Sequence, residues 1–198
     1  MADFTVPELH EYPVIPTIKK DSMAHSRPYV AKAEFQQPLG YPGELLDNWQ
    51  DVAVNKMGEL LNKYRSLTVF LDSCVKCGAC TDKCHYYLGT SDPKNMPVAR
   101  QDLLRSVYRR YFTTAGKYFP KLVGARDFSK EVLDEWYSYF HQCSQCRRCS
   151  VFCPYGIDTA EISMAGREIL DSVGVGQKYC NEIIGKVNKI GNNLGLPE

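Results

Sequence analysis

The chain has 198 residues, of which 44% are hydrophobic and 24% are charged, and its formal net charge is +1. This length fits one domain or two small ones, and the near-zero charge excludes a global signature of nucleic-acid or membrane-surface binding. The longest largely apolar run, residues 67–71, is far shorter than the ~20 residues that span a bilayer, so we expect no transmembrane segment. Residues 1–10 lack the basic and apolar regions of an export signal, and nine cysteines without export indicate a reducing, cytoplasmic compartment.

The N-terminal region is rich in proline and should form no long helix. Its prolines are Pro7, Pro13, Pro16, Pro28, Pro38 and Pro42. Such a density favours an extended arm that wraps a surface, although a floppy tail fits the composition equally well. We therefore expect an irregular arm over residues 1–44 and a helical domain over residues 45–198.

A helix should occupy residues 45–64. Apolar side chains recur there at steps of three and four residues, at Leu46, Trp49, Val52, Ala53, Met57, Leu60, Leu61 and Tyr64. This period places them on one helix face, where they would pack against a core. Residues 65–73 should be a short link to the first cysteine.

The first cysteine run has the spacing C-x2-C-x2-C-x3-C. Its members are Cys74, Cys77, Cys80 and Cys84. Bacterial ferredoxins hold iron–sulfur clusters with this spacing, closed by a proline; here His85 stands in place of that proline.

Residues 87–130 form a basic insertion. A turn-rich loop at 89–97 should lead into a helix over about 98–112. Residues 93–130 contain nine basic residues and only two acidic ones, Asp102 and Asp127. The basic residues are Lys94, Arg100, Arg105, Arg109, Arg110, Lys117, Lys121, Arg126 and Lys130. Two interpretations remain open, a solvated helix face and a docking surface for an acidic partner. No nucleic-acid-binding motif is present.

The second cysteine run repeats the spacing of the first and adds the closing proline. It consists of Cys143, Cys146, Cys149 and Cys153, followed by Pro154. A helix that begins at the N-cap Ser129 and ends near His141 should lead into it. The residue pattern at Asp158 and Glu161 resembles a capping box, which predicts a helix to about Val173. A last helix should span about 177–190, with Cys180 as a buried structural thiol.

The two runs together indicate two [4Fe–4S] clusters with exchanged fourth ligands. In two-cluster ferredoxins the fourth cysteine of each run ligates the other cluster. One cluster would be held by Cys74, Cys77, Cys80 and Cys153, and the other by Cys143, Cys146, Cys149 and Cys84. His85 and His141 flank two of these ligands and could replace a thiolate, but eight cysteines already suffice.

Two other uses of the cysteines fit less well. Structural zinc prefers isolated C-x2-C pairs that close one four-thiolate site, which leaves no role for the third cysteine of each run. A disulfide scaffold requires an oxidising compartment. The alternative that stays open is a non-redox interaction module with structural zinc and a basic docking surface.

Two cysteine runs joined by helical segments resemble the α-helical ferredoxin of heterodisulfide reductase iron–sulfur subunits. The segments 72–85 and 141–156, with the basic insertion between them, are similar to the N-terminal part of the K subunit of the sulfite-reduction-associated membrane complex (the DsrK type). The resemblance covers essentially the whole chain. It implies a mainly α protein in which helices cradle two [4Fe–4S] clusters after the irregular arm.

The resemblance also implies a function. Electrons would pass between a membrane-bound b-type cytochrome subunit, with the other subunits of the redox complex, and the disulfide or trisulfide of a small sulfur-carrier protein of the DsrC type. The protein would be cytoplasmic and peripheral to the inner membrane through its partners. In that family cysteine-rich CCG modules handle the substrate, and this sequence contains no CCG run. We therefore expect either the ferredoxin part of a longer subunit or a catalytic site on another polypeptide, and we identify no catalytic residue.

Overall fold

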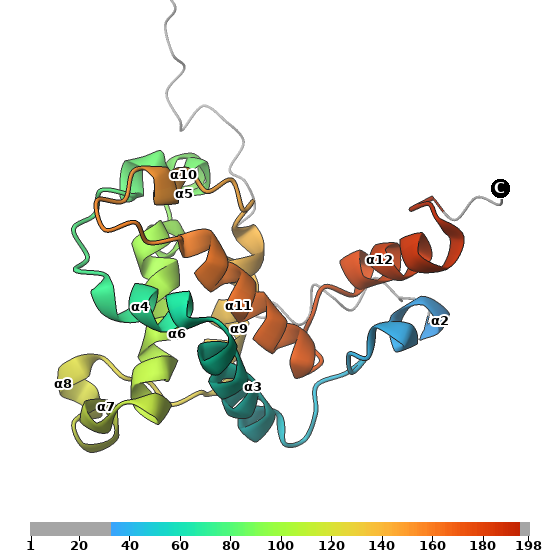
Figure 1. The fold of residues 1–198 in the computed structure, drawn as a ribbon, viewed down its shortest axis with the longest axis horizontal. Coiled ribbons are helices and arrows are strands. Elements are labelled where there is room, and N and C mark those ends of the chain that lie inside the picture. Colours follow the sequence, from blue (N-terminus) through green and yellow to red (C-terminus); the bar gives the residue numbers. More distant parts are fainter. Residues whose placement is uncertain (1–32, 195–198) are drawn as a thin grey trace, which may run out of the picture.

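The computed structural model describes residues 33–194, and every regular element among them is a helix (Figure 1). The α-helices are α2 (Ala33–Gln36), α3 (Trp49–Lys63), α4 (Arg65–Ser73), α5 (His85–Thr90), α6 (Pro97–Phe112), α7 (Thr114–Tyr118), α8 (Pro120–Val123), α9 (Lys130–Gln142), α10 (Arg148–Val151), α11 (Thr159–Ser172) and α12 (Lys178–Ile190). The 3-10 helices are η2 (Gln37–Leu39), η3 (Thr81–Lys83) and η4 (Pro93–Asn95). The expected mainly α fold is confirmed. None of the helices between residues 33 and 194 combines the length and the hydropathy of a membrane span.

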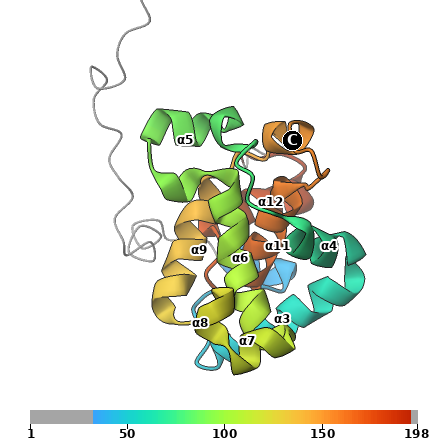
Figure 2. The ribbon, with the colours of Figure 1, turned by 90° about the vertical axis from the view of Figure 1, so that its left-hand side faces the viewer.

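Helix α6 lies at the centre of the fold. It runs between α9 and α4 and also contacts α3 and α11 (Figure 2). Pro97 stands at its first position, where proline is tolerated because the N–H it lacks would be unpaired anyway. Leu104 and Val107 are fully buried on this helix, so α6 forms the apolar centre around which the other helices pack.

An aromatic cluster centred on Trp136 of α9 joins three of these helices. The Trp136 ring lies 4.6 Å from that of Phe128 and 5.3 Å from that of Phe140, and its Nε1 donates to the Leu103 carbonyl of α6 at 3.2 Å. On α11, a Cβ added to Gly166 would lie 2.4 Å from the Phe140 ring. Only glycine therefore permits the observed approach of α11 to α9.

The helix caps were predicted better than the link before the first cysteine. Ser129 accepts from the Val132 N–H at 3.4 Å and Asp158 accepts from the Ala160 N–H at 2.9 Å, as N-caps do. The capping box at Asp158 is only half formed, because Glu161 accepts from the Ser66 hydroxyl instead. Residues 65–73 are not a link but the helix α4, whose leucines at 67 and 71 are buried in the core.

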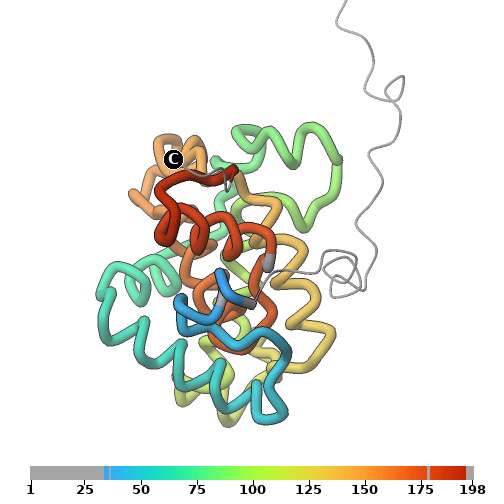
Figure 3. Tube along the Cα trace, turned by 90° about the vertical axis from the view of Figure 1, so that its right-hand side faces the viewer, coloured from blue at the N-terminus to red at the C-terminus, as the bar shows by residue number. Residues whose placement is uncertain are grey.

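The end of the predicted arm packs against the C-terminal helix, as Figure 3 shows for α2 and α12. A Cβ added to Gly185 of α12 would lie 1.9 Å from the Phe35 carbonyl oxygen, and Phe35 is buried. The Leu46 N–H donates to the Val173 carbonyl at 3.2 Å. Residues 1–32, most of the predicted arm, lie outside the described residues.

Candidate metal centre

Both cysteine loops lie at one end of the helical body. Helix α10 of the second loop contacts η3 of the first, and this end is opposite to α7 and α8 (Figure 1). Cys74 and Cys143 are the C-caps of α4 and α9, with nearly identical backbone angles (φ −70°, ψ 116° and φ −70°, ψ 120°). A helix thus delivers each first cysteine in the same conformation, and the two loops are structural repeats.

The repeat extends through the loops as a pair of left-handed residues around each second cysteine. Lys76 and Gln145 precede it with φ of 58° and 61°, and Gly78 and Arg147 follow it with φ of 79° and 58°. Left-handed residues in such turns direct successive backbone N–H groups into a concavity that binds anions, a device found at iron–sulfur sites. The loop geometry therefore fits an anionic cluster.

The pair Gly78 and Arg147 tests the role of the left-handed position. A Cβ added to Gly78 would meet nothing closer than the Thr81 Oγ1 at 3.8 Å, so Gly78→Ala should lower the free energy of unfolding by about 1 kcal/mol through backbone conformation alone. Arg147→Gly should leave it nearly unchanged, because relief of the same strain offsets the lost ion pair with Asp158. Urea unfolding measures both, and an equal loss in the two variants would contradict this account.

The eight cysteines of the two runs line two hollows, each open to solvent. The first, of about 370 Å³ with the open solvent at its mouth included, is lined by Cys74, Cys77, Cys80, Cys149 and Cys153. The second, of about 360 Å³ on the same basis, is lined by Cys84, Cys143, Cys146 and Cys149. Each hollow thus receives three cysteines of one run and the fourth cysteine of the other, with Cys149 at the boundary. The structure brings together the two sets of four that the spacing predicts.

The fourth cysteine of each run lies beyond a short helical turn, and its thiol lines the hollow of the other run. Cys84 follows η3, is buried and lines the second hollow, whereas Cys153 follows α10 and lines the first. Among residues 33–194, no three His, Cys, Asp or Glu side chains converge closely enough to hold a single ion. The thiols of each set instead line the walls of one hollow.

Burial disfavours free thiolates in both hollows. It raises the pKa of Cys80 to about 11 and also raises the pKa of Cys149. Because iron binds thiolate and not thiol, loading each hollow would release protons, and the bound iron would supply the positive charge that burial otherwise denies these sulfurs.

Two helices begin at the hollows. Val98 and Gln101 of α6 line the first hollow and Arg100 lines the second, while Thr159 of α11 lines both. The N-terminus of a helix carries partial positive charge, which favours an anionic group nearby. The fold therefore aims two helix N-termini at the space between the cysteines.

Arginines hold the two first cysteines in place. Arg105 of α6 is buried and donates to the Cys74 carbonyl at 3.1 and 3.2 Å. Arg167 of α11 donates to the Phe140 carbonyl at 2.7 Å and to the Cys143 carbonyl. These bonds satisfy the free carbonyls at the ends of α4 and α9, so each loop is fixed by a guanidinium from a neighbouring helix.

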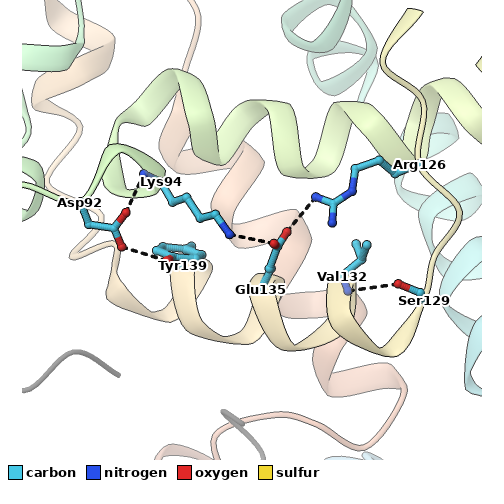
Figure 4. A network of polar contacts seen from close by, with 7 residues as sticks. All are labelled: Asp92, Lys94, Arg126, Ser129, Val132, Glu135 and Tyr139. Carbon is cyan, nitrogen blue, oxygen red and sulfur yellow. Dashed lines mark hydrogen bonds and ion pairs between the residues drawn. The ribbon is translucent and has the colours of Figure 1, made fainter. Parts of the chain in front are cut away.

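Several basic residues of the insertion form ion pairs within the protein. Glu135 of α9 accepts from Lys94 at 2.8 Å and from Arg126 at 2.7 Å, and Asp92 accepts from the Tyr139 hydroxyl at 2.8 Å (Figure 4). Burial alone would raise the pKa of Glu135, but the hydrogen bonds from the two cations outweigh it and lower this pKa. The acidic partner of these cations is thus the chain itself.

The other basic residues divide into buried and exposed sets. Arg100 and Arg105 are buried, and Arg110 pairs with Asp127 at 2.5 Å. Lys117, Lys121 and Lys130 are exposed, as are Tyr118, Phe119 and Leu122 of the α7–α8 turn. Both interpretations of the insertion, a solvated face or a docking surface, are therefore wrong for the two arginines nearest the hollows.

The sequence contained a signal for the buried arginines. Arg100 lies four residues before Leu104 and seven before Val107, on the apolar stripe of its own helix. A charged residue in such a stripe needs a buried partner.

Cys180, expected to be buried, is exposed and its thiol lies 2.9 Å from the Gln177 Oε1.

Comparison with known proteins agrees with this geometry. Residues 70–157 match the family model of the 4Fe-4S dicluster domain. This part of the chain is therefore similar to 4Fe–4S dicluster domains. This match favours iron–sulfur clusters over the zinc alternative. No solved structure matches the chain at a significant level.

The relatives of the chain are heterodisulfide-reductase-like subunits. It is 56% identical to the Hdr-like menaquinol oxidoreductase iron-sulfur subunit 2 of Archaeoglobus fulgidus over 82% of this chain and 30% of that protein. It is 53% identical to the Hdr-like menaquinol oxidoreductase iron-sulfur subunit of Archaeoglobus profundus over 77% of this chain and 28% of that protein. One subunit of the dihydromethanophenazine:CoB–CoM heterodisulfide reductase of Methanosarcina barkeri is 33% identical over 54% of this chain and 25% of that protein. The chain spans less than a third of the length of these relatives. The expected resemblance to heterodisulfide reductase subunits is confirmed, at the level of similarity to these proteins.

Proposed function

We propose that the chain holds two [4Fe–4S] clusters, one in each hollow, and conducts electrons as the ferredoxin part of a DsrK-type, heterodisulfide-reductase-like subunit. The observation that carries this proposal is the pair of hollows, each receiving three cysteines of one run and the fourth of the other. Bound clusters would supply one-electron redox chemistry. Residues 45–198 would form the domain that holds them, with residues 1–44 as its arm.

The chain's own residues have three tasks in this function. The cysteines bind iron, and the left-handed turns orient backbone N–H groups around them. Val98 and Ile157 line the first hollow and limit the access of water to it. Cys77 and Cys146, the second cysteines of the two runs, are exposed. A redox partner would approach closest at these two positions.

The partners we propose lie on either side of the clusters. A membrane-bound b-type cytochrome subunit would exchange electrons with one cluster, and a DsrC-type sulfur-carrier protein would be served from the other through a CCG-type site. The names of the relatives include a menaquinol oxidoreductase and a heterodisulfide reductase, which supports redox chemistry linked to a quinol at one end and to a disulfide at the other. The protein would then lie on the cytoplasmic side of the membrane, attached through its partners.

Metal analysis of protein purified without oxygen tests the core of this function. We expect about eight iron and eight sulfide per chain, a brown colour, and bleaching on reduction, since two cubanes contain that many atoms. Chelation of the iron should remove the colour and reduce the free energy of unfolding, because ligation and folding are coupled. A colourless protein with stoichiometric zinc would instead establish the interaction-module alternative.

A further inference from the structure

Arg100 is a buried cation in direct contact with a proposed cluster ligand. Its side chain is 2% exposed, and its Nη1 lies 3.5 Å from the Cys84 sulfur. The same guanidinium donates through Nε to the Tyr139 carbonyl at 3.0 Å and through Nη2 to the Asn95 Oδ1 at 2.8 Å. Three fixed partners leave the guanidinium a single orientation, with one N–H directed at the sulfur.

The Cys84 sulfur has one other polar neighbour among the described residues, the Asn95 carbonyl oxygen at 3.6 Å. A thiol can donate to that oxygen, but an iron-bound thiolate has no proton to give. Once the hollow is loaded, Arg100 therefore becomes the polar donor to this sulfur. The contact is charge-assisted, which makes it stronger than a hydrogen bond between neutral groups.

The first hollow has no equivalent contact within residues 33–194. Lys76, the charged residue that lines it, is 54% exposed and pairs with Asp102 at 2.7 Å. Arg105 is buried nearby, but its hydrogen bonds go to the Cys74 carbonyl and not to a sulfur. The repeat of the two loops is therefore broken in one respect, the presence of a cation at a ligand sulfur.

Other cations near the second hollow are less effective. Lys83 pairs with Asp82 at 2.7 Å, Arg147 pairs with Asp158 at 3.2 Å, and Arg148 is exposed. Arg147 is 61% exposed, and exposed charges are screened by water and salt. The buried charge of Arg100 acts in a region of low dielectric, where a charge interaction is stronger.

We propose that Arg100 raises the reduction potential of the cluster in the second hollow above that of the cluster in the first. Each cluster becomes more negative on reduction, and a hydrogen bond from a buried cation to a ligand sulfur stabilises the reduced form more than the oxidised one. This inference rests on the proposed two-cluster function, and it assigns the higher-potential end of the chain to Cys84, Cys143, Cys146 and Cys149.

Redox titration followed by EPR tests the inference on the iron-loaded chain. In the wild type we expect two separate reduction steps, and Cys84→Ser should alter the one at higher potential. Arg100→Gln should lower the reduction potential of that same step by ~59 mV, which is a tenfold change of the one-electron equilibrium toward the oxidised form. The potential of the other step should stay in place. Lys76→Gln, the matched control at the first hollow, should move neither step appreciably.

Iron analysis separates failure of this inference from failure of the proposed function. A wild type without eight iron would refute the two clusters themselves. Full iron content with coincident steps, or with the Cys84 step at the lower potential, would overturn the role of Arg100 alone. Arg100→Met removes the charge, keeps an unbranched side chain and serves if Arg100→Gln does not load. We expect a shift in the same direction, and an unshifted Cys84 step in this variant would also overturn the inference.

Discussion

Cys153→Ser is expected to destroy or impair the cluster of the first cysteine run, although Cys153 belongs to the second. Cys153 lines the hollow formed by Cys77 and its neighbours, and not the hollow of Cys146. Loss of one thiolate leaves an iron corner without its ligand, so we expect at least half of the iron to remain but one of the two EPR signals to vanish or change its shape. Low-temperature EPR of the dithionite-reduced protein, with iron analysis, provides the measurement.

Comparison with local ligand variants identifies which signal is lost. Cys153→Ser should reproduce the spectrum of Cys77→Ser, and Cys84→Ser should reproduce that of Cys146→Ser. Cys180→Ser should change neither signal, because Cys180 is exposed and lines neither hollow. If Cys153→Ser instead resembled Cys146→Ser, each run would ligate its own cluster and the crossed assignment would be wrong.

The sequence predicted the features of this site that depend on local spacing. Three cysteines at steps of three form one loop, and the fourth falls beyond a helical turn, so the distribution over two hollows could be derived without coordinates. Ser129 and Asp158 were likewise predictable as caps, because an N-cap needs only its own side chain and the next two or three residues. Features that depend on such local chemistry can be predicted from a single sequence.

Features that depend on distant partners were not predictable. Glu135 of α9 pairs with Lys94 and Arg126. Because Glu135 lies outside the insertion in the sequence, a count of the charges along the insertion did not include it. The helix over 65–73 was missed because it spans only nine residues directly after α3, from which the single residue Tyr64 separates it. Arg100 occupied an apolar position of its stripe, but the sulfur that explains it lies sixteen residues away in the sequence. Tertiary packing decides all three.

Trp136→Ala should lower the free energy of unfolding by about 3–5 kcal/mol, the range for removal of a large buried aromatic side chain. The Trp136 side chain is 0% exposed, lies between Phe128 and Phe140, and donates to the Leu103 carbonyl of α6. Its loss opens a cavity at the junction of α6 and α9. Urea unfolding of the iron-loaded protein under anaerobic conditions measures the change.

Two variants separate the cavity from lesser effects. Trp136→Phe keeps a six-membered aromatic ring but loses the pyrrole part of the indole with its N–H, so we expect a loss nearer 1–2 kcal/mol. Tyr118→Ala removes an aromatic side chain that is 79% exposed and should change the free energy of unfolding by less than about 0.5 kcal/mol. Since Cys143 is the C-cap of α9, Trp136→Ala should also weaken iron retention in the second hollow more than in the first. Equal loss of iron from both hollows would show that α9 does not position the second loop. A free energy of unfolding like that of Tyr118→Ala would contradict the cavity.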